Sequence, residues 1–130
     1  MTTPLDKFLE LLQRSGLASS AEIDRSRAEF PFTLTDEFAV DEFCRGLVDK
    51  GVLTAWQCDK LRRGRWKGFF LDGYCLLRHI GKDATSAYYL CREVATGKPM
   101  ALRVTAPGHS PDGKLHYEFQ DPPPDVLPNR

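Results

Sequence analysis

The chain has 130 residues, of which 42% are hydrophobic and 28% are charged, a composition typical of one globular domain or two small ones. Eighteen basic residues balance eighteen acidic ones, so no overall field attracts the chain to nucleic acid or anionic lipid. No apolar run approaches the roughly twenty residues that a membrane-spanning helix needs, and the first residues lack the pattern of a secretion signal. We therefore expect a cytoplasmic protein without a membrane partner.

Residues 1–64 predict a module of four helices. Apolar residues recur at helical spacing in the first and third helices, and capping boxes, in which Ser or Thr is followed three positions later by Glu or Gln, begin the second and fourth. The third opens with acidic side chains, which are favourable at the positive end of a helix dipole. We expect the helices to begin at Pro4, Ser19, Thr35 and Thr54, and the second to end before Pro31.

The two halves of this module repeat at an offset of thirty-five residues. Residues 12–25 align with residues 47–60, and each segment contains a helix end, a glycine cap, an apolar residue and a newly capped helix. Each half is a helix-turn-helix hairpin that buries its apolar face against its neighbour. Such hairpins can bind DNA, but residues 22–29 are mixed in charge where a recognition helix needs groove-reading side chains. We expect no nucleic-acid partner.

A basic and aromatic linker occupies residues 65–72. One interpretation is an anion or nucleic-acid patch that uses Trp66 as a stacking surface. The other, which we favour, is a cationic helix end followed by aromatic side chains, Trp66, Phe69 and Phe70, that join the helical module to the next module. The candidate interaction residues are Trp56, Arg65, Trp66, Lys67, Phe69 and Phe70.

Residues 73–120 predict an antiparallel sheet of three or four strands. The first two segments are rich in Tyr, Leu, Ile and Val and flank a turn, and a second turn leads into the third. The last segment alternates apolar and polar residues, as a half-buried strand does. The predicted fold class is therefore α+β. The expected strand segments are 74–80, 87–94, 100–105 and 114–120.

Cysteine and histidine spacing indicates no metal site. Cys44, Cys58, Cys75 and Cys91 fit neither a zinc half-site nor a dense disulfide framework, and we interpret them as buried free thiols. Cys75 and Cys91 lie about equally far from the first strand turn and could face each other, although a disulfide there would need an oxidising compartment. The proline-rich residues 121–130 predict a disordered or polyproline tail.

The strand segments resemble the start of a protein kinase domain, in which a glycine-rich loop joins the first two strands and the third carries a lysine. On that pattern Gly81, Asp83 and Ser86 stand at the three loop glycines, and Arg103 stands at the lysine. In a kinase these positions contact the nucleotide phosphates. Asp83 adds a negative charge there, and the guanidinium of Arg103 is wider than an ammonium.

The linker extends this resemblance. Residues 51–57 and 61–77 are similar to the segment before the kinase domain in large serine/threonine kinases of planctomycete-type bacteria, where a Gly-Leu-Leu-Thr-x-Trp-Gln helix precedes a Gly-Arg-x-Lys-Gly-Phe-Phe-Leu linker. The similarity covers roughly residues 8–104. The chain contains neither His-Arg-Asp nor Asp-Phe-Gly after Arg103, so the resemblance implies a truncated, degenerate kinase N-lobe without a catalytic base or magnesium ligands.

The resemblance implies a non-catalytic interaction or regulatory module that uses no cofactor and binds another protein. One alternative is a nucleotide sensor, with ATP over residues 81–86 and Arg103 at its phosphates, or with a cyclic dinucleotide at the helical repeat. For the latter, residues 7–9 and 42–44 correspond to the Arg-Leu-Gly starts of helical units in secretion and pilus ATPases, but keep only the apolar middle residue. A further alternative is the N-terminal part of a larger serine/threonine kinase.

Overall fold

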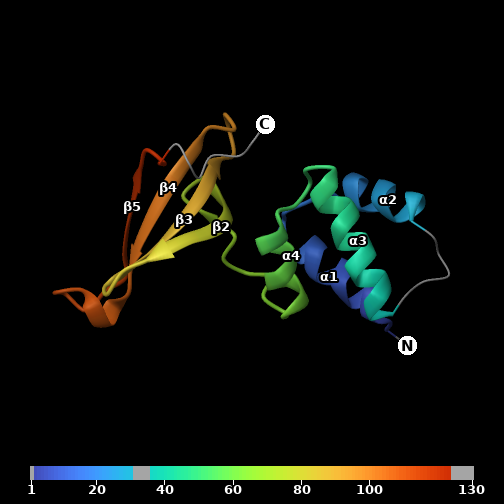
Figure 1. Ribbon diagram of the computed structural model, residues 1–130, viewed down its shortest axis with the longest axis horizontal. Coiled ribbons are helices and arrows are strands. Elements are labelled where there is room, and N and C mark those ends of the chain that lie inside the picture. Colours follow the sequence, from blue (N-terminus) through green and yellow to red (C-terminus); the bar gives the residue numbers. More distant parts are fainter. Residues whose placement is uncertain (1, 31–35, 124–130) are drawn as a thin grey trace. The chain divides into compact units, whose positions relative to one another are not determined.

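The computed structural model describes residues 2–30 and 36–123 (Figure 1). The chain divides after Phe69 into two compact units, here named the helical unit and the sheet unit. This boundary lies within the segment expected to be a linker. The fold class is α+β, as the sequence predicts. The expected helix start at Thr35 and most of the expected tail, residues 124–130, lie outside the described residues.

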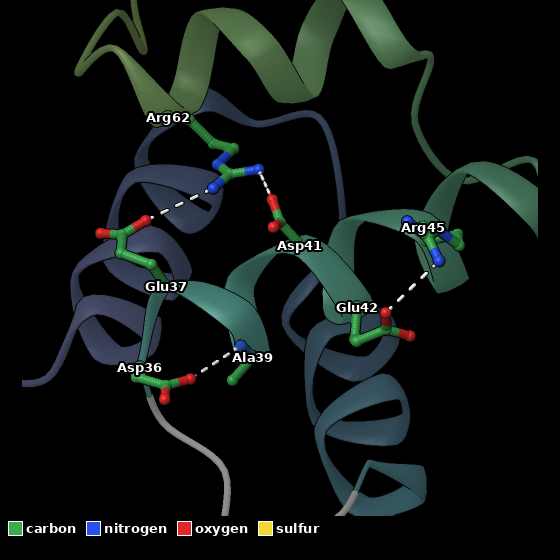
Figure 2. Close-up of polar contacts among 7 residues, drawn as sticks. All are labelled: Asp36, Glu37, Ala39, Asp41, Glu42, Arg45 and Arg62. Atoms are coloured by element: carbon green, nitrogen blue, oxygen red, sulfur yellow. Dashed lines mark hydrogen bonds and ion pairs between the residues drawn. The ribbon is translucent and has the colours of Figure 1, made fainter.

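The helical unit contains the four predicted helices, and local capping explains where they begin. Complete capping boxes begin α1, α2 and α4 at Thr3, Ser19 and Thr54, and Asp36 caps α3 by accepting the Ala39 amide at 3.0 Å (Figure 2). Within the described ranges no helix is long and apolar enough to cross a membrane. The bounds are α1 (Pro4–Ser15), α2 (Ser20–Glu29), α3 (Glu37–Asp49) and α4 (Ala55–Arg62).

The sequence repeat is also a repeat of structure. Phe8 of α1 and Phe43 of α3, which are equivalent in the repeat, are both buried and meet edge to face with ring centroids 6.3 Å apart. Gly16 and Gly51 both have φ of 76°, the left-handed conformation that glycine adopts at a helix C-terminus without a Cβ clash. The buried core is Leu5, Phe8, Leu12, Ala18, Ile23, Val40, Phe43, Cys44, Leu47, Leu53, Cys58, Leu61 and Phe69.

The sheet unit contains five antiparallel strands among its described residues, in sequence order. The sequence predicts three or four strands, and the additional strand is the short β1. Asp72 and Gly73, with φ of 50° and 83°, form a two-residue turn that pairs Leu71 with Tyr74 and so creates β1. The strands are β1 (Phe70–Leu71), β2 (Tyr74–Lys82), β3 (Ser86–Glu93), β4 (Pro99–Thr105) and β5 (His116–Gln120).

The register of β2 against β3 separates two cysteines that the sequence suggested could face each other. Cys75 pairs with Arg92, whereas Cys91 pairs with Leu76, so the two cysteines are offset by one position along the strands. Successive side chains point to opposite faces of a sheet. All four cysteines are buried free thiols, as we interpreted them from the sequence.

Candidate functional site

The turn between β2 and β3 is closed by the carboxylate of Asp83. Its Oδ1 accepts the backbone N–H of Thr85 at 3.0 Å and that of Ser86 at 2.8 Å, and its Oδ2 accepts the Tyr88 hydroxyl at 2.8 Å. Hydrogen bonds from the Thr85 amide, the Tyr88 hydroxyl and the Ser86 amide stabilise the charged form and lower the pKa of Asp83 to about 2. Asp83 is therefore anionic at neutral pH.

This arrangement opposes phosphate binding at the turn. Phosphate-binding loops direct backbone N–H groups at the ligand. Here the amides of Thr85 and Ser86 already donate to an anion that belongs to the chain. A phosphate would have to displace the Asp83 carboxylate and would meet its negative charge.

Gly81, the expected first loop glycine, lies within β2 and pairs with Tyr88. An added Cβ at this position would meet nothing within 4 Å, and its φ lies outside the left-handed region. Neither a close approach nor an unusual backbone conformation therefore requires glycine here. The turn itself begins only after Lys82, the last residue of β2.

Arg103 lies on β4, where groups of the neighbouring strands hold its guanidinium. Its Nε donates to the Ser86 hydroxyl at 3.1 Å, and its Nη1 lies 3.5 Å from the carboxylate of Glu118, its register partner on β5. Both charged side chains reach solvent, so this ion pair contributes no more than about 1 kcal/mol to folding. Its main effect is to orient Arg103 along the sheet. The structure thus brings Asp83 and Arg103 together at Ser86, whose backbone N–H donates to Asp83 and whose hydroxyl accepts from Arg103 Nε.

A hollow of about 460 Å³ opens beside Arg103. Asp112 organises its rim, because its carboxylate accepts the Ser110 hydroxyl at 2.6 Å and lies 2.7 Å from Nε2 of His116. The Ser110 hydroxyl and His116 lower the pKa of Asp112 to about 2. The Arg103 guanidinium and the hydroxyl groups suit a small anion, although Glu118 opposes one. The lining residues are Thr85, Arg103, Thr105, His109, Ser110, Pro111, His116, Tyr117 and Glu118.

The candidate interaction residues separate into core and surface positions. Phe69 is 3% exposed and belongs to the core of the helical unit, where its ring meets that of Trp56 edge to face at 5.9 Å. Phe70 begins the sheet unit and is 44% exposed. Trp56 and Trp66 are half-buried against the helical core. Phe69 therefore serves the core, and the two tryptophans each present part of an indole ring.

Cationic side chains lie over both indole rings. The Arg14 guanidinium carbon and Lys67 Nζ lie 5.8 Å and 5.1 Å from the ring centroid of Trp66, and Lys60 Nζ lies 5.5 Å from that of Trp56. Lys60 could have been found from sequence because it follows Trp56 by one helical turn, whereas no local signal connects Arg14 to Trp66. We use the name tryptophan surface for the two tryptophans, the three cations over their rings and the exposed Arg65 that precedes Trp66, that is, Arg14, Trp56, Lys60, Arg65, Trp66 and Lys67.

The positions considered for a cyclic dinucleotide lack binding groups. Phe8 and Phe43 are buried in the core. Glu42 pairs with Arg45 at 3.3 Å on the exposed side of α3 (Figure 2). In the second hairpin of the repeat, a dinucleotide phosphate would thus meet the Glu42 carboxylate instead of the guanidinium that the resemblance requires.

Comparison with known proteins does not place the chain in a family. No family model, curated protein or solved structure matches the chain. Within residues 2–30 and 36–123, no group of three or more His, Cys, Asp or Glu side chains could hold a metal ion. Function must therefore be argued from the geometry of the turn, the hollow and the tryptophan surface.

Proposed function

We propose that this chain is a non-catalytic interaction or regulatory module derived from a protein kinase. The observation that carries the proposal is the closed turn, in which Asp83 holds the amides of Thr85 and Ser86. Arg103, at the position of the kinase lysine, is engaged by Ser86 and Glu118. The positions that handle phosphate in a kinase are thus satisfied by side chains of the chain itself.

The partner of Arg103 supports the same proposal. Glu118, the acidic partner of Arg103, lies on β5, whereas a kinase lysine pairs with a glutamate on a helix.

We place the protein partner at the tryptophan surface. Tryptophan and arginine are enriched among residues that dominate binding energy at protein interfaces. The cations over the indole rings orient the tryptophan side chains, so these side chains lose less conformational entropy when a partner binds. Four basic side chains in this surface, Arg14, Lys60, Arg65 and Lys67, favour an acidic segment of the partner.

The catalytic half of the proposal is tested by incubating the pure protein with Mg²⁺ and radiolabelled ATP, with and without a generic phosphoacceptor. The expected result is no transfer to the protein or to the acceptor. Transfer that disappears in the Arg103→Ala variant and persists in Arg92→Ala, which changes an exposed arginine on β3, would overturn the proposal.

The interaction half is tested by charge reversal. Proteins that co-purify with the tagged chain should be lost in Lys67→Glu and retained in Arg45→Glu, because both side chains are exposed on the helical unit but only Lys67 belongs to the tryptophan surface. Equal retention by both variants would contradict the placement of the partner.

The hollow beside Arg103 favours a second candidate function, a sensor of nucleotides or related phosphorylated ligands. His109, His116 and Arg103 line it together with three hydroxyl side chains of Ser and Thr. Calorimetry with ATP distinguishes the two functions. Binding that is lost in Arg103→Ala and kept in Arg92→Ala would favour the sensor, whereas no heat at millimolar ATP would favour the interaction module.

A further inference from the structure

Cys44 of α3 and Cys58 of α4 bring two free thiols together inside the helical unit. The two residues are 7% and 5% exposed, and their thiol groups are hydrogen-bonded to each other. Both line one hollow of about 330 Å³ on this unit. The two thiols therefore lie within hydrogen-bonding reach of each other and beside a hollow that a small reagent can enter.

The repeat indicates that packing does not require this pair. An offset of thirty-five residues places Leu9 and Ile23 of the first hairpin at the positions of Cys44 and Cys58 in the second. Apolar side chains without a thiol thus serve at the same two positions of the first hairpin. At both positions the second hairpin carries cysteine, the side chain whose two copies can form a covalent bond.

The surroundings make the two thiols unequal. The hydrogen bond from Cys44 lowers the pKa of the Cys58 thiol, burial opposes this, and the positive charge of Arg62 adds to the lowering. The hydrogen bond to Cys58, together with burial, raises the pKa of the Cys44 thiol. Arg62 is itself paired with Glu37 and Asp41 (Figure 2), so it is held near the pair.

Other charged groups also line the hollow. They are Asp41, Arg45, Asp49, Asp59 and Arg62. Three carboxylates and two guanidinium groups therefore line the hollow beside the two thiols. Arg62 is the basic group whose charge acts on both of them, and Cys58 is the thiol that forms the thiolate more easily.

We propose that Cys44 and Cys58 are a reversible thiol-oxidation site whose co-reactant is hydrogen peroxide. The Cys58 thiolate attacks one peroxide oxygen, the O–O bond breaks, and the departing hydroxide takes a proton to become water, which leaves Cys58 as a sulfenic acid. The Cys44 sulfur then attacks the Cys58 sulfur, the S–O bond breaks, and the hydroxyl leaves as water with the Cys44 proton. Two thiols lose two electrons, and one peroxide becomes two waters.

The disulfide would tie α4 to α3 within the second hairpin. It would close the loop between residues 44 and 58, which contains the C-terminal end of α3, the Gly51 cap and the first turn of α4. Such a cross-link restricts the unfolded chain and stabilises the folded helices. A dithiol reductant would reverse it by thiol–disulfide exchange. This inference does not depend on the proposed function.

Cys75 and Cys91 of the sheet unit provide an internal control. Their strand register offsets them. The Cys91 thiol donates to the Met100 carbonyl at 3.3 Å, and burial raises its pKa to about 11. Both features oppose formation of a nucleophilic thiolate at Cys91.

The test is a peptide map of the full chain after peroxide treatment. Reduced protein is treated with hydrogen peroxide, unfolded, blocked with N-ethylmaleimide and digested with trypsin, which places the four cysteines in separate peptides, 28–45, 51–60, 68–78 and 83–92. The expected result is a cross-link between 28–45 and 51–60 that dithiothreitol removes, with maleimide on the other two peptides. Maleimide on all four cysteines, or cross-links among all pairs to a similar extent, would overturn the proposal.

Variants give a second test that does not rely on the cross-linked peptide. Cys58→Ser removes the proposed nucleophile, so Cys44 should remain open to maleimide after peroxide treatment, while Cys91→Ser should leave the cross-link unchanged. Far-UV circular dichroism shows whether each variant is folded. Loss of the Cys44 maleimide adduct in folded Cys58→Ser at the wild-type rate would overturn the assignment of Cys58 as the nucleophile.

Discussion

Truncating Phe69 to Ala should strongly destabilise the helical unit, whereas the same change at Phe70 should not. Phe69 is 3% exposed and meets Trp56 edge to face, whereas Phe70 is 44% exposed. The two residues are adjacent and chemically identical. Their comparison therefore isolates burial from every other property of the side chain.

The expected magnitude follows from the size of the unit. Replacing a buried Phe by Ala costs about 3–5 kcal/mol. The helical unit spans Met1–Phe69, and a chain of this length has a free energy of unfolding of roughly 3–10 kcal/mol at about 0.05–0.15 kcal/mol per residue. Phe69→Ala should therefore remove a large part of that stability, and Phe70→Ala should change it by less than about 1 kcal/mol.

The aromatic residues of the chain allow each unit to be followed separately. Trp56 and Trp66 are the two tryptophans of the chain, and both belong to the helical unit. Urea unfolding monitored by tryptophan fluorescence thus reports on that unit, and tyrosine absorbance reports on the sheet unit, which holds all four tyrosines. A lower urea midpoint of the tryptophan signal is expected for Phe69→Ala alone. Equal midpoints for the two variants would refute the assignment of Phe69 to the helical core.

Two further predictions concern backbone conformation and pH. Gly51→Ala should destabilise the helical unit by about 1–2 kcal/mol because Gly51 has φ of 76°. Gly46→Ala should stabilise it by about 0.5–1 kcal/mol, because Gly46 lies inside α3 and nothing lies within 4 Å of the added Cβ. Urea midpoints that move in the same direction for both variants would contradict this. The Asp83 carboxyl should titrate at about 2 by NMR instead of at its ordinary 3.8. Because its folded pKa is lowered, its stabilising contribution is complete above the ordinary value and is lost as the pH falls from about 4 to about 2, and a midpoint near 3.8 would count against the closed turn.

The helices and their repeat could be predicted from sequence because their signals are local. Capping boxes at Ser19 and Thr54 and glycine caps at Gly16 and Gly51 each act within a few residues, and the structure confirms them. The Asp72–Gly73 pair is a further local signal, because Asp-Gly favours a two-residue hairpin turn. It forms β1 in a segment for which the basic and aromatic composition predicts a linker.

The contacts at the turn, at Arg103 and between the two cysteines depend on strand register and tertiary packing, which the spacing of residues along the sequence does not determine. The sequence placed Glu118 in a strand, but only the pairing of β4 with β5 brings it opposite Arg103. Asp83 was expected to repel phosphate, yet its hydrogen bonds to the turn amides depend on the conformation of the turn. The hydrogen bond between Cys44 and Cys58 depends on the packing of α3 and α4. The repeat could have indicated the pair, because both cysteines stand where the first hairpin has apolar residues.

We propose that side chains of the chain itself occupy the positions that correspond, in the kinase resemblance, to those holding nucleotide phosphates. The most direct measurement is a two-dimensional ¹H–¹⁵N NMR titration of the labelled protein with ATP, with and without Mg²⁺. We predict that the amide signals of Thr85, Ser86 and Arg103 do not shift at millimolar ATP, because Asp83 already holds the amides of Thr85 and Ser86 and Glu118 already pairs with the Arg103 guanidinium. Saturable shifts confined to residues 81–87 and Arg103 would contradict it.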